Sequence, residues 1–326
     1  MQFHLTLDPK PFPEKIAHQH NLFLIGSCFT EQIGSKLRSY KFDVTENPNG
    51  ILFNPISIAH ALAGYLKPKQ YTTADLFERD GLWGSWDHHT LFSKSNPDVS
   101  LQLINQSQQM AHISLQNANW LLITLGSAFG YERTGAGVVA NCHKVPADQF
   151  HKRLFESNEI VSVLKEQLTE LRRFNPGIRI IFTISPVRHL RDGFVENNRS
   201  KAQLITAVHA LCEEISGCNY FPAYELVIDD LRDYRFYAED LVHPNYAATN
   251  YVWEKFRKAA LSTETELILE ELHTLLLAYN HKPFNPDSEQ HRLFMQKQAD
   301  RCKALMARYP HIDLQVEYRH FTGGSV

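Results

Sequence analysis

The stretch "NLFLIGSCFTEQIGSKL", residues 21–37, joins an apolar run to a helical pattern through a turn of small residues. The four consecutive apolar residues Leu22 to Ile25 are typical of a strand that is buried on both faces. Beyond the turn, apolar residues recur every four positions, at Phe29, Ile33 and Leu37. This spacing predicts an amphipathic helix, so Ser27 and Cys28 lie at a strand-to-helix turn.

Ser27 at this turn has two interpretations. As a helix cap, its hydroxyl would accept a hydrogen bond from a backbone N–H of the first helical turn. As a nucleophile, it would lie at the sheet edge beside unpaired helix-start N–H groups, and it would need a base. Cys28 offers a third interpretation as a softer nucleophile, although its apolar neighbours suit a buried structural cysteine.

The strongest candidate for that base lies in "FYAEDLVHPNY", residues 236–246. Asp240 and His243 are separated by two residues, so on a tight turn the carboxylate can bond one imidazole nitrogen and fix the tautomer. The other nitrogen would then be free to take the serine proton. The same spacing also suits a purely structural hydrogen-bonded pair, and the pattern by itself does not separate the two.

The alternation of apolar run and helix continues along the chain. Two further runs, Trp120 to Leu125 and Ile178 to Ile184, indicate buried strands, and a shorter strand is expected near Tyr220-Phe221. Helical apolar spacing follows the two longer runs, over residues 160–171 and 204–215. Continuous apolar strands separated by helices predict an α/β fold, a three-layer α/β/α sandwich with a central parallel sheet.

The chain divides in two by pattern. We expect residues 1–260 to form the α/β domain, with an irregular insertion at about 64–117, where no regular period is visible. From residue 261 to residue 326 the pattern changes to two helical runs broken by prolines, which predicts a C-terminal helical hairpin. Self-association of the protein through these helices is left open.

Composition bounds the function. The chain has 326 residues, of which 43% are hydrophobic and 21% charged, and its net charge is −3. Without a basic run, nucleic acid is not an expected partner. The N-terminus lacks the layout of a signal peptide, and no apolar stretch has membrane-spanning length, so we expect no membrane association.

The five cysteines form no C-x-x-C pair, which fits a reducing compartment, and the expected location is the cytoplasm. We expect no metal and no cofactor, because four histidines that could suggest a metal site match no compact ligand spacing. These histidines are His88, His89, His143 and His189.

Two more polar turns follow predicted strands, "LGSAFGY" (residues 125–131) and "SPVRH" (residues 185–189). Ligands of parallel sheets bind at the carboxyl ends of the strands, so we expect these turns to lie beside Ser27. Arg188 could bind an anionic group of a substrate, and this remains open. Three aromatic residues suit either a sugar-stacking surface or an ordinary core, namely Trp83, Trp86 and Tyr131.

Here the chain resembles the GSCFA family, a branch related to the SGNH (GDSL-like) hydrolases. The resemblance rests on Gly26-Ser27-Cys28-Phe29 near the start and Asp240-Leu241-Val242-His243 near the end of the α/β region. Further matching stretches follow in order between residues 21 and 258: "NPNGILFNP" (47–55), "TLGSAFGY" (124–131), "NCHKVP" (141–146), "SPVRHLRDG" (185–193) and "LRDYRFYAEDLVHP" (231–244). The resemblance implies an SGNH-hydrolase-like sandwich.

The same resemblance implies roles for individual residues. Ser27 matches the nucleophile, His243 the base and Asp240 the residue that orients the base. Gly50 matches the glycine whose backbone N–H helps to form the oxyanion hole, with the Ser27 N–H as another donor.

In the third motif the sequence departs from the family pattern. The related hydrolases carry Gly-x-Asn-Asp, whereas this chain has Gly126-Ser127-Ala128-Phe129. The asparagine that donates to the oxyanion is missing, with Ser127 as a local substitute and Asn54 as a remote one.

We therefore expect a serine hydrolase, esterase- or deacetylase-like, that removes an acyl group, with acetyl as the first candidate, from a carbohydrate or small metabolite. An O-acyltransferase using the same acyl-enzyme is a close variant. A non-catalytic carbohydrate-binding or scaffold protein is the alternative of a different class, motivated by the missing asparagine.

Overall fold

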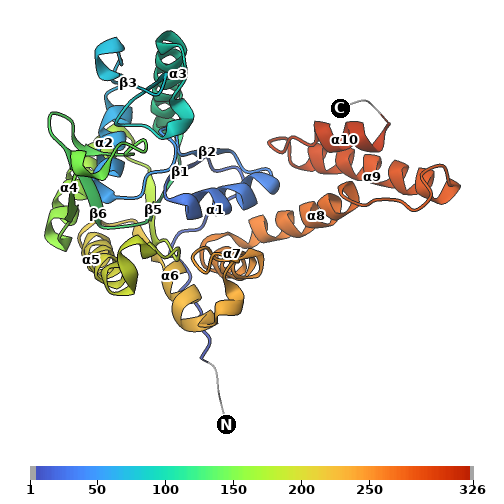
Figure 1. Ribbon diagram of the computed structural model, residues 1–326. Helices are drawn as coiled ribbons and strands as arrows, with labels where there is room; N and C mark the ends of the chain where they lie inside the picture. The colour runs from blue at the N-terminus through green and yellow to red at the C-terminus, as the bar shows by residue number, and fades with distance from the viewer. Residues whose placement is uncertain (1–4, 324–326) are drawn as a thin grey trace.

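Five parallel strands form the central sheet of the computed structural model, which describes residues 5–323. Their order across the sheet is β10-β9-β5-β1-β2 (Figure 1). The strands are β1 (Leu22–Gly26), β2 (Val44–Glu46), β5 (Trp120–Leu125), β9 (Arg179–Ile184) and β10 (Cys218–Phe221). The predicted strands are thus confirmed. The edge strand β2 was not predicted, because three residues are too few to show a pattern.

Helices cover both faces of this sheet. One face packs against α1 (Cys28–Ser39) and α7 (Tyr246–Ala260). The other face packs against four helices, α2 (Pro55–Leu66), α3 (Pro97–Asn117), α4 (Ser157–Phe174) and α5 (Gly193–Glu214). The expected three-layer α/β/α arrangement is confirmed.

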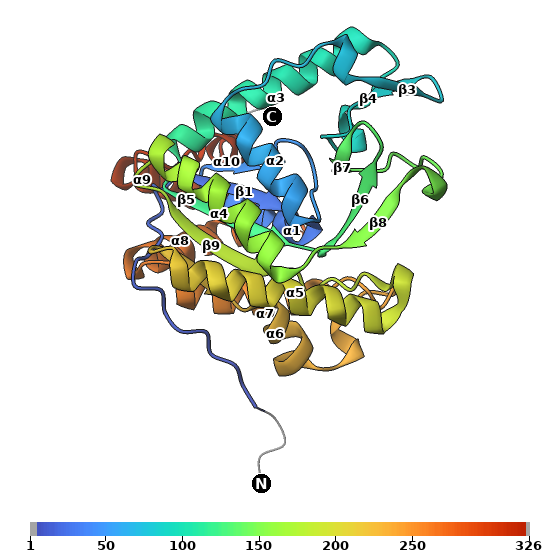
Figure 2. The same ribbon diagram turned by 90° about the vertical axis from the view of Figure 1, so that its left-hand side faces the viewer.

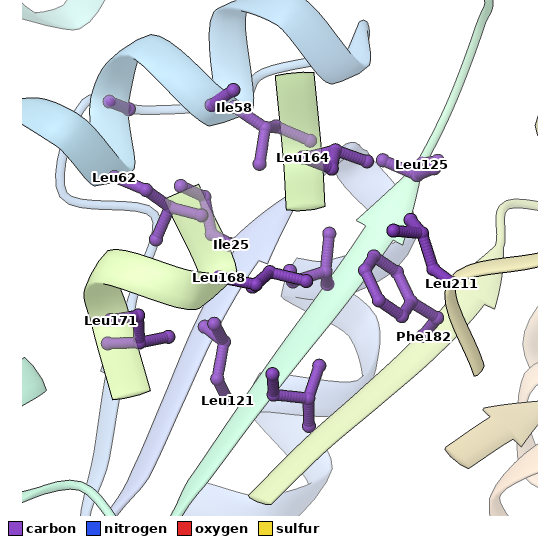
Figure 3. Close-up of a cluster of buried hydrophobic side chains, with 14 of the residues drawn as sticks. Ile25, Ile58, Leu62, Leu121, Leu125, Leu164, Leu168, Leu171, Phe182 and Leu211 are labelled. Atoms are coloured by element: carbon purple, nitrogen blue, oxygen red, sulfur yellow. The ribbon is translucent and has the colours of Figure 1, made fainter. Parts of the chain in front are cut away.

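Alternation along the strands supplies both cores. In β1, Phe23 and Ile25 enter the larger cluster, while Leu22 and Leu24 enter the cluster on the opposite face. A strand whose successive side chains are all apolar can bury both faces because they alternate in direction. Figure 3 shows the larger cluster, with side chains of α2, α4 and α5 meeting those of β1, β5 and β9.

Two small antiparallel units lie on one side of the central sheet, at the right in Figure 2. The first is the hairpin β3 (Phe77–Arg79) and β4 (Leu82–Gly84). The second is a three-stranded sheet of order β7-β6-β8, made of β6 (Phe129–Arg133), β7 (Gly137–Val139) and β8 (His151–Leu154). Because β6 begins soon after β5 ends, this second sheet is placed beyond the carboxyl end of the central strands.

Short helical turns complete the domain: η1 (Thr73–Asp75), η2 (Thr90–Phe92), η3 (Ala147–Gln149), η4 (Leu190–Asp192), α6 (Ala223–Glu225), the π-helix η5 (Leu226–Leu231) and η6 (Tyr234–Phe236). None of the helices described between residues 5 and 323 combines the length and apolar character needed to cross a membrane. Nor do three His, Cys, Asp or Glu side chains in this range converge as a metal site would require.

The prediction of an irregular insertion at about 64–117 is wrong for its second half. Residues 97–117 form α3, the second-longest helix, with a proline in its first turn and Asn96 as its cap. Its buried face carries polar as well as apolar side chains, Ser100, Ile104, Gln108, Ala111 and Leu115. The buried positions of α3 therefore have helical spacing, but they are not all apolar, so the apolar pattern did not reveal the helix.

The C-terminal region holds three helices, α8 (Thr263–Tyr279), α9 (Glu289–Arg308) and α10 (Gln315–Phe321). The two predicted helices are present, but a hairpin is incomplete as a description, because α10 packs against α9. Helix α8 extends away from the α/β domain (Figure 1). Its Leu269 belongs to a core cluster of that domain, while Ile268, Leu272 and Leu275 belong to a separate C-terminal cluster.

Candidate active site

The direction of the chain connections reverses between β1 and β5. The connection from β1 leads through α1 to β2 on one side, whereas the connection from β5 leads through α4 to β9 on the other. At such a reversal, the loops beyond the carboxyl ends separate and leave room for a ligand. Ser27 follows β1 and Gly126-Ser127 follow β5, so the predicted positions of both turns are confirmed.

Two glycines allow the turns to approach each other. Gly26 has φ +145°, and a Cβ built on it would lie 2.2 Å from the carbonyl oxygen of Thr124. A Cβ on Gly126 would lie 3.1 Å from the Cβ of Ser27 and 3.3 Å from the Phe53 ring. A larger residue at either position would push β1 and β5 apart at the site.

Ser27 occupies the N-cap position of α1, but its side chain makes no capping hydrogen bond. The residue is 0% exposed, and within residues 5–323 its Oγ has no hydrogen-bond partner. Other helices of the chain are capped by side chains in the ordinary way, by Asn54, Asn96, Asn245, Ser262 and Ser288. A buried hydroxyl without a partner costs about 1–3 kcal/mol, so a function other than capping has to explain it.

Asp240 and His243 form the predicted pair. Asp240 Oδ2 lies 2.7 Å from His243 Nδ1, while Oδ1 accepts the backbone N–H groups of His243 (3.0 Å) and Val242 (2.9 Å). The backbone and ring N–H groups of His243, followed by the N–H of Val242, lower the pKa of Asp240 to about 2. The permanent carboxylate places the imidazole proton on Nδ1 and leaves Nε2 as a base.

The loop that carries this pair is tightly built. Leu241 has φ +58°, and the N–H of Ala238 donates to the carbonyl of His243 at 2.7 Å. The N–H of Arg188 donates to the carbonyl of Val242 at 3.3 Å, which joins the turn after β9 to this loop. The His243 side chain is 43% exposed.

The predicted hydrogen bond between Ser27 and His243 is not formed, since Ser27 Oγ has no partner in the described part of the chain. Catalytic hydrogen bonds are often long or misaligned before substrate binds, so the assignment of the two residues stays a prediction.

The two N–H groups predicted to form the oxyanion hole donate to backbone carbonyls in this structure. The N–H of Gly50 donates to the carbonyl of Asn47 at 2.7 Å, and the N–H of Ser27 donates to that of Thr124 at 3.1 Å. Gly50 has φ +77°, and a Cβ there would lie 2.3 Å from the Cβ of His89. A tight turn and a close approach therefore account for this glycine.

Asn54 and Ser127 line one pocket, whereas Arg188 and the three predicted catalytic residues, Ser27, Asp240 and His243, do not line it. The Asn54 amide is committed to Ser57, because Oδ1 accepts its N–H at 2.8 Å and Nδ2 donates to its hydroxyl at 2.9 Å. Ser127 Oγ accepts the N–H of Phe129 at 3.0 Å.

The Arg188 guanidinium lies over the rings of Tyr237 (4.3 Å) and Tyr234 (5.0 Å). It therefore supports the loop that carries His243 rather than the pocket.

This pocket has a volume of about 290 Å³. Its lining combines aromatic rings with hydrogen-bonding and charged groups, namely Phe53, Phe129, Tyr131, Asn54, Ser127, Asn141, Lys152, His189, Arg191 and Asp192. Rings beside a few polar groups are the composition of a small-molecule site. Tyr131 thus belongs to the pocket, whereas Trp86 stacks on Phe77 with ring centroids 3.9 Å apart.

His189 entered the sequence analysis only as one of four histidines without metal spacing. Its ring meets Phe53 edge to face, with centroids 5.5 Å apart, and both residues line the pocket. Burial, followed by the charges of Lys201, His243 and Lys152, lowers the pKa of His189 to about 4. The ring is therefore neutral near pH 7.

Lys201 is the residue that sequence reasoning missed. It is 1% exposed, and its Nζ donates to the carbonyl oxygens of Gly126 (2.7 Å) and Ser185 (2.6 Å). It thereby ties together the turns that follow β5 and β9, and burial lowers its pKa to about 7. The available signal was its place on the buried face of α5, with Asn197, Leu204, Val208 and Leu211.

Cys28 is a poor nucleophile here. Burial, followed by the charge of Glu31, raises the pKa of its thiol, and this outweighs the helix-start N–H groups that favour the thiolate. Since the thiolate is the reactive form, the structure favours the neighbouring serine.

The fold and site define an α/β protein with a parallel central sheet and a pocket at the carboxyl edge of its strands. The chain belongs to the GSCFA family, whose model matches residues 21–256. A second model, the C-terminal domain of GSCFA domain proteins, matches residues 273–323.

Two solved structures show a weak similarity to this chain. One is a carbohydrate esterase family 3 from Talaromyces cellulolyticus, with 9% identity, a TM-score of 0.35 and coverage of 78% of this chain and 99% of that one. The other is a mutant acetyl esterase with acetate ion, with 10% identity, a TM-score of 0.35 and coverage of 79% of this chain and 100% of that one. Comparison with curated protein sequences gives no match.

Proposed function

We propose that the protein is a serine hydrolase that removes an acyl group, such as acetyl, from an oxygen of a carbohydrate or small metabolite. The observation that carries the proposal is the Ser27 hydroxyl, which is buried at the start of α1 and is not used to cap it. The Asp240–His243 pair supplies a base in the tautomer that the reaction needs.

In the proposed reaction, Ser27 Oγ attacks the ester carbonyl while His243 Nε2 takes the serine proton. The tetrahedral intermediate collapses, the alcohol leaves with that proton, and an acyl-serine forms. Water, deprotonated by the same nitrogen, then releases the acid. Asp240 stabilises the imidazolium ion that forms in both steps.

The oxyanion requires a donor other than Gly50. Ser127 lines the pocket at the end of β5, one residue beyond the glycine that contacts Ser27. Its hydroxyl oxygen accepts the N–H of Phe129 and lies 3.2 Å from the Ser200 hydroxyl; with Ser200 as the donor of that bond, the Ser127 proton is left for a developing oxyanion. We assign Ser127 as this donor in place of the missing asparagine.

Turnover of p-nitrophenyl acetate and labelling by a fluorophosphonate probe test the proposal. We expect both in the parent protein and neither in Ser27→Ala. Their absence from folded parent protein would refute the hydrolase and favour the carbohydrate-binding alternative, which the committed N–H groups of Ser27 and Gly50 also suit. Transfer of the acetyl group to an added sugar alcohol, at the expense of free acetate, would identify the transferase variant.

A further inference from the structure

A second hollow, of about 380 Å³, adjoins the pocket. It lies along α2, and Ala140 lines both hollows. Between them, the hydroxyl of Ser57 donates to the carbonyl of Val139 at 3.3 Å. This bond divides the two hollows, and a ligand that occupies both would have to cross it at Ala140.

An unsatisfied acceptor lies in the wall of this second hollow. Gln108 is 2% exposed, and its Nε2 donates to Asn49 Oδ1 at 2.7 Å. Its Oε1 has no partner among residues 5–323, and a Cβ added to Gly64 would lie 3.2 Å from it. Gly64 and Gln108 both line the hollow, so this buried oxygen lies in its wall, beside a position without a side chain. Buried acceptors are normally paired, so a donor from outside the chain would complete it.

The other groups of the hollow suit sugar hydroxyls. Asp87, Tyr71 and Asn49 line it beside Gln108. Tyr71 donates its hydroxyl to Asp87 Oδ2 at 3.0 Å, and Asn49 donates to the backbone carbonyl of Asp87 at 3.0 Å. These bonds hold the Asp87 carboxylate in place, and its remaining acceptor sites can take hydroxyl donors.

We propose that the second hollow binds a second sugar unit, so that the substrate is an acylated oligosaccharide or polysaccharide rather than a monosaccharide. The inference rests on the proposed function, because it extends the same site. Binding energy from a remote unit would raise kcat/KM for longer substrates without touching the reacting atoms.

The test compares acetylated xylose with acetylated xylo-oligosaccharides of two to four units. We expect kcat/KM to rise at least tenfold from the monosaccharide to the longer substrates. Gly64→Leu, which fills the hollow, should abolish this gain in kcat/KM with chain length. Ala304→Leu, on an exposed position of α9, is the matched control and should retain the gain.

Asp87→Ala empties the hollow instead of filling it, and should also reduce the gain if Gly64→Leu fails to fold. A kcat/KM that is independent of chain length, or a gain that survives both substitutions, would overturn the proposal. If the parent protein hydrolyses no ester, the hydrolase fails separately. Calorimetric titration of unacetylated xylotetraose into the parent and Gly64→Leu proteins still decides the hollow, because only the parent should bind.

Discussion

The lowered pKa of Lys201 can be tested through its effect on the free energy of unfolding. Burial lowers its pKa from the usual 10.5 to about 7, a difference that corresponds to about 5 kcal/mol between the folded and unfolded states. Between these two values the unfolded chain binds more protons, so the free energy of unfolding should rise with pH. The penalty is fully present below about pH 7 and disappears above the unfolded value.

The perturbation is Lys201→Met, which keeps the length of the side chain and removes the titrating group. Denaturant unfolding of both proteins from pH 6.5 to pH 9.5 gives the difference in unfolding free energy, parent minus variant. This difference should rise by about 3 kcal/mol over the range, at roughly 1.4 kcal/mol per pH unit above pH 7. Groups that do not interact with Lys201 titrate alike in both proteins and cancel. The Cys28 thiol does interact with Lys201, so both proteins carry Cys28→Ser.

The loss of the two hydrogen bonds to Gly126 and Ser185 gives an offset between the proteins. For the neutral amine this offset is constant, and the strengthening of the two bonds when the amine takes a proton is already contained in its pKa. Lys165→Met, at an exposed lysine, is the matched control for replacing a lysine by methionine. A flat or falling difference for Lys201→Met would mean that the ammonium ion stays charged in the folded protein, and the reasoning would be refuted.

Three further predictions concern the site directly. Ser27→Ala should lower turnover of p-nitrophenyl acetate by about three or more orders of magnitude, whereas Cys28→Ser should retain most of it; the reverse result would reassign the nucleophile. His243→Ala should lower turnover by a similar factor without changing the free energy of unfolding by more than about 1 kcal/mol, and a variant that keeps most of the turnover would exclude His243 as the base. Gly50→Ala should lower the free energy of unfolding by about 1–3 kcal/mol, measured by denaturant melting, because φ +77° and the 2.3 Å approach to His89 exclude a side chain; an unchanged midpoint would show that the turn relaxes.

The central sheet could be predicted because its signals are local. Each long strand is a continuous apolar run, and each ends at a turn whose position follows from where the run stops. Helix α3 was not predicted because Ser100 and Gln108 occupy positions on its buried face where apolar residues would normally mark the helical period. Apolar periodicity alone does not reveal a helix when some of its buried positions carry polar side chains.

The site could be predicted in part for a similar reason. Asp240 and His243 are close in sequence, so their bond follows from a tight turn. Gly50 was assigned by resemblance to a family pattern, and its N–H is used by a turn in this chain. Lys201 lies on α5 and reaches two strand ends, and no local pattern encodes a contact between α5 and the turns after β5 and β9.

Helix α8 contributes side chains both to a core of the α/β domain and to the C-terminal cluster. Leu269 is anchored in the α/β domain, and three residues further on Leu272 is anchored in the C-terminal cluster, without a loop between them. A rigid rod of this kind leaves no hinge, so the C-terminal helices can reorient only if α8 itself melts. A truncation inside α8 would thus expose apolar side chains that are buried in the intact protein.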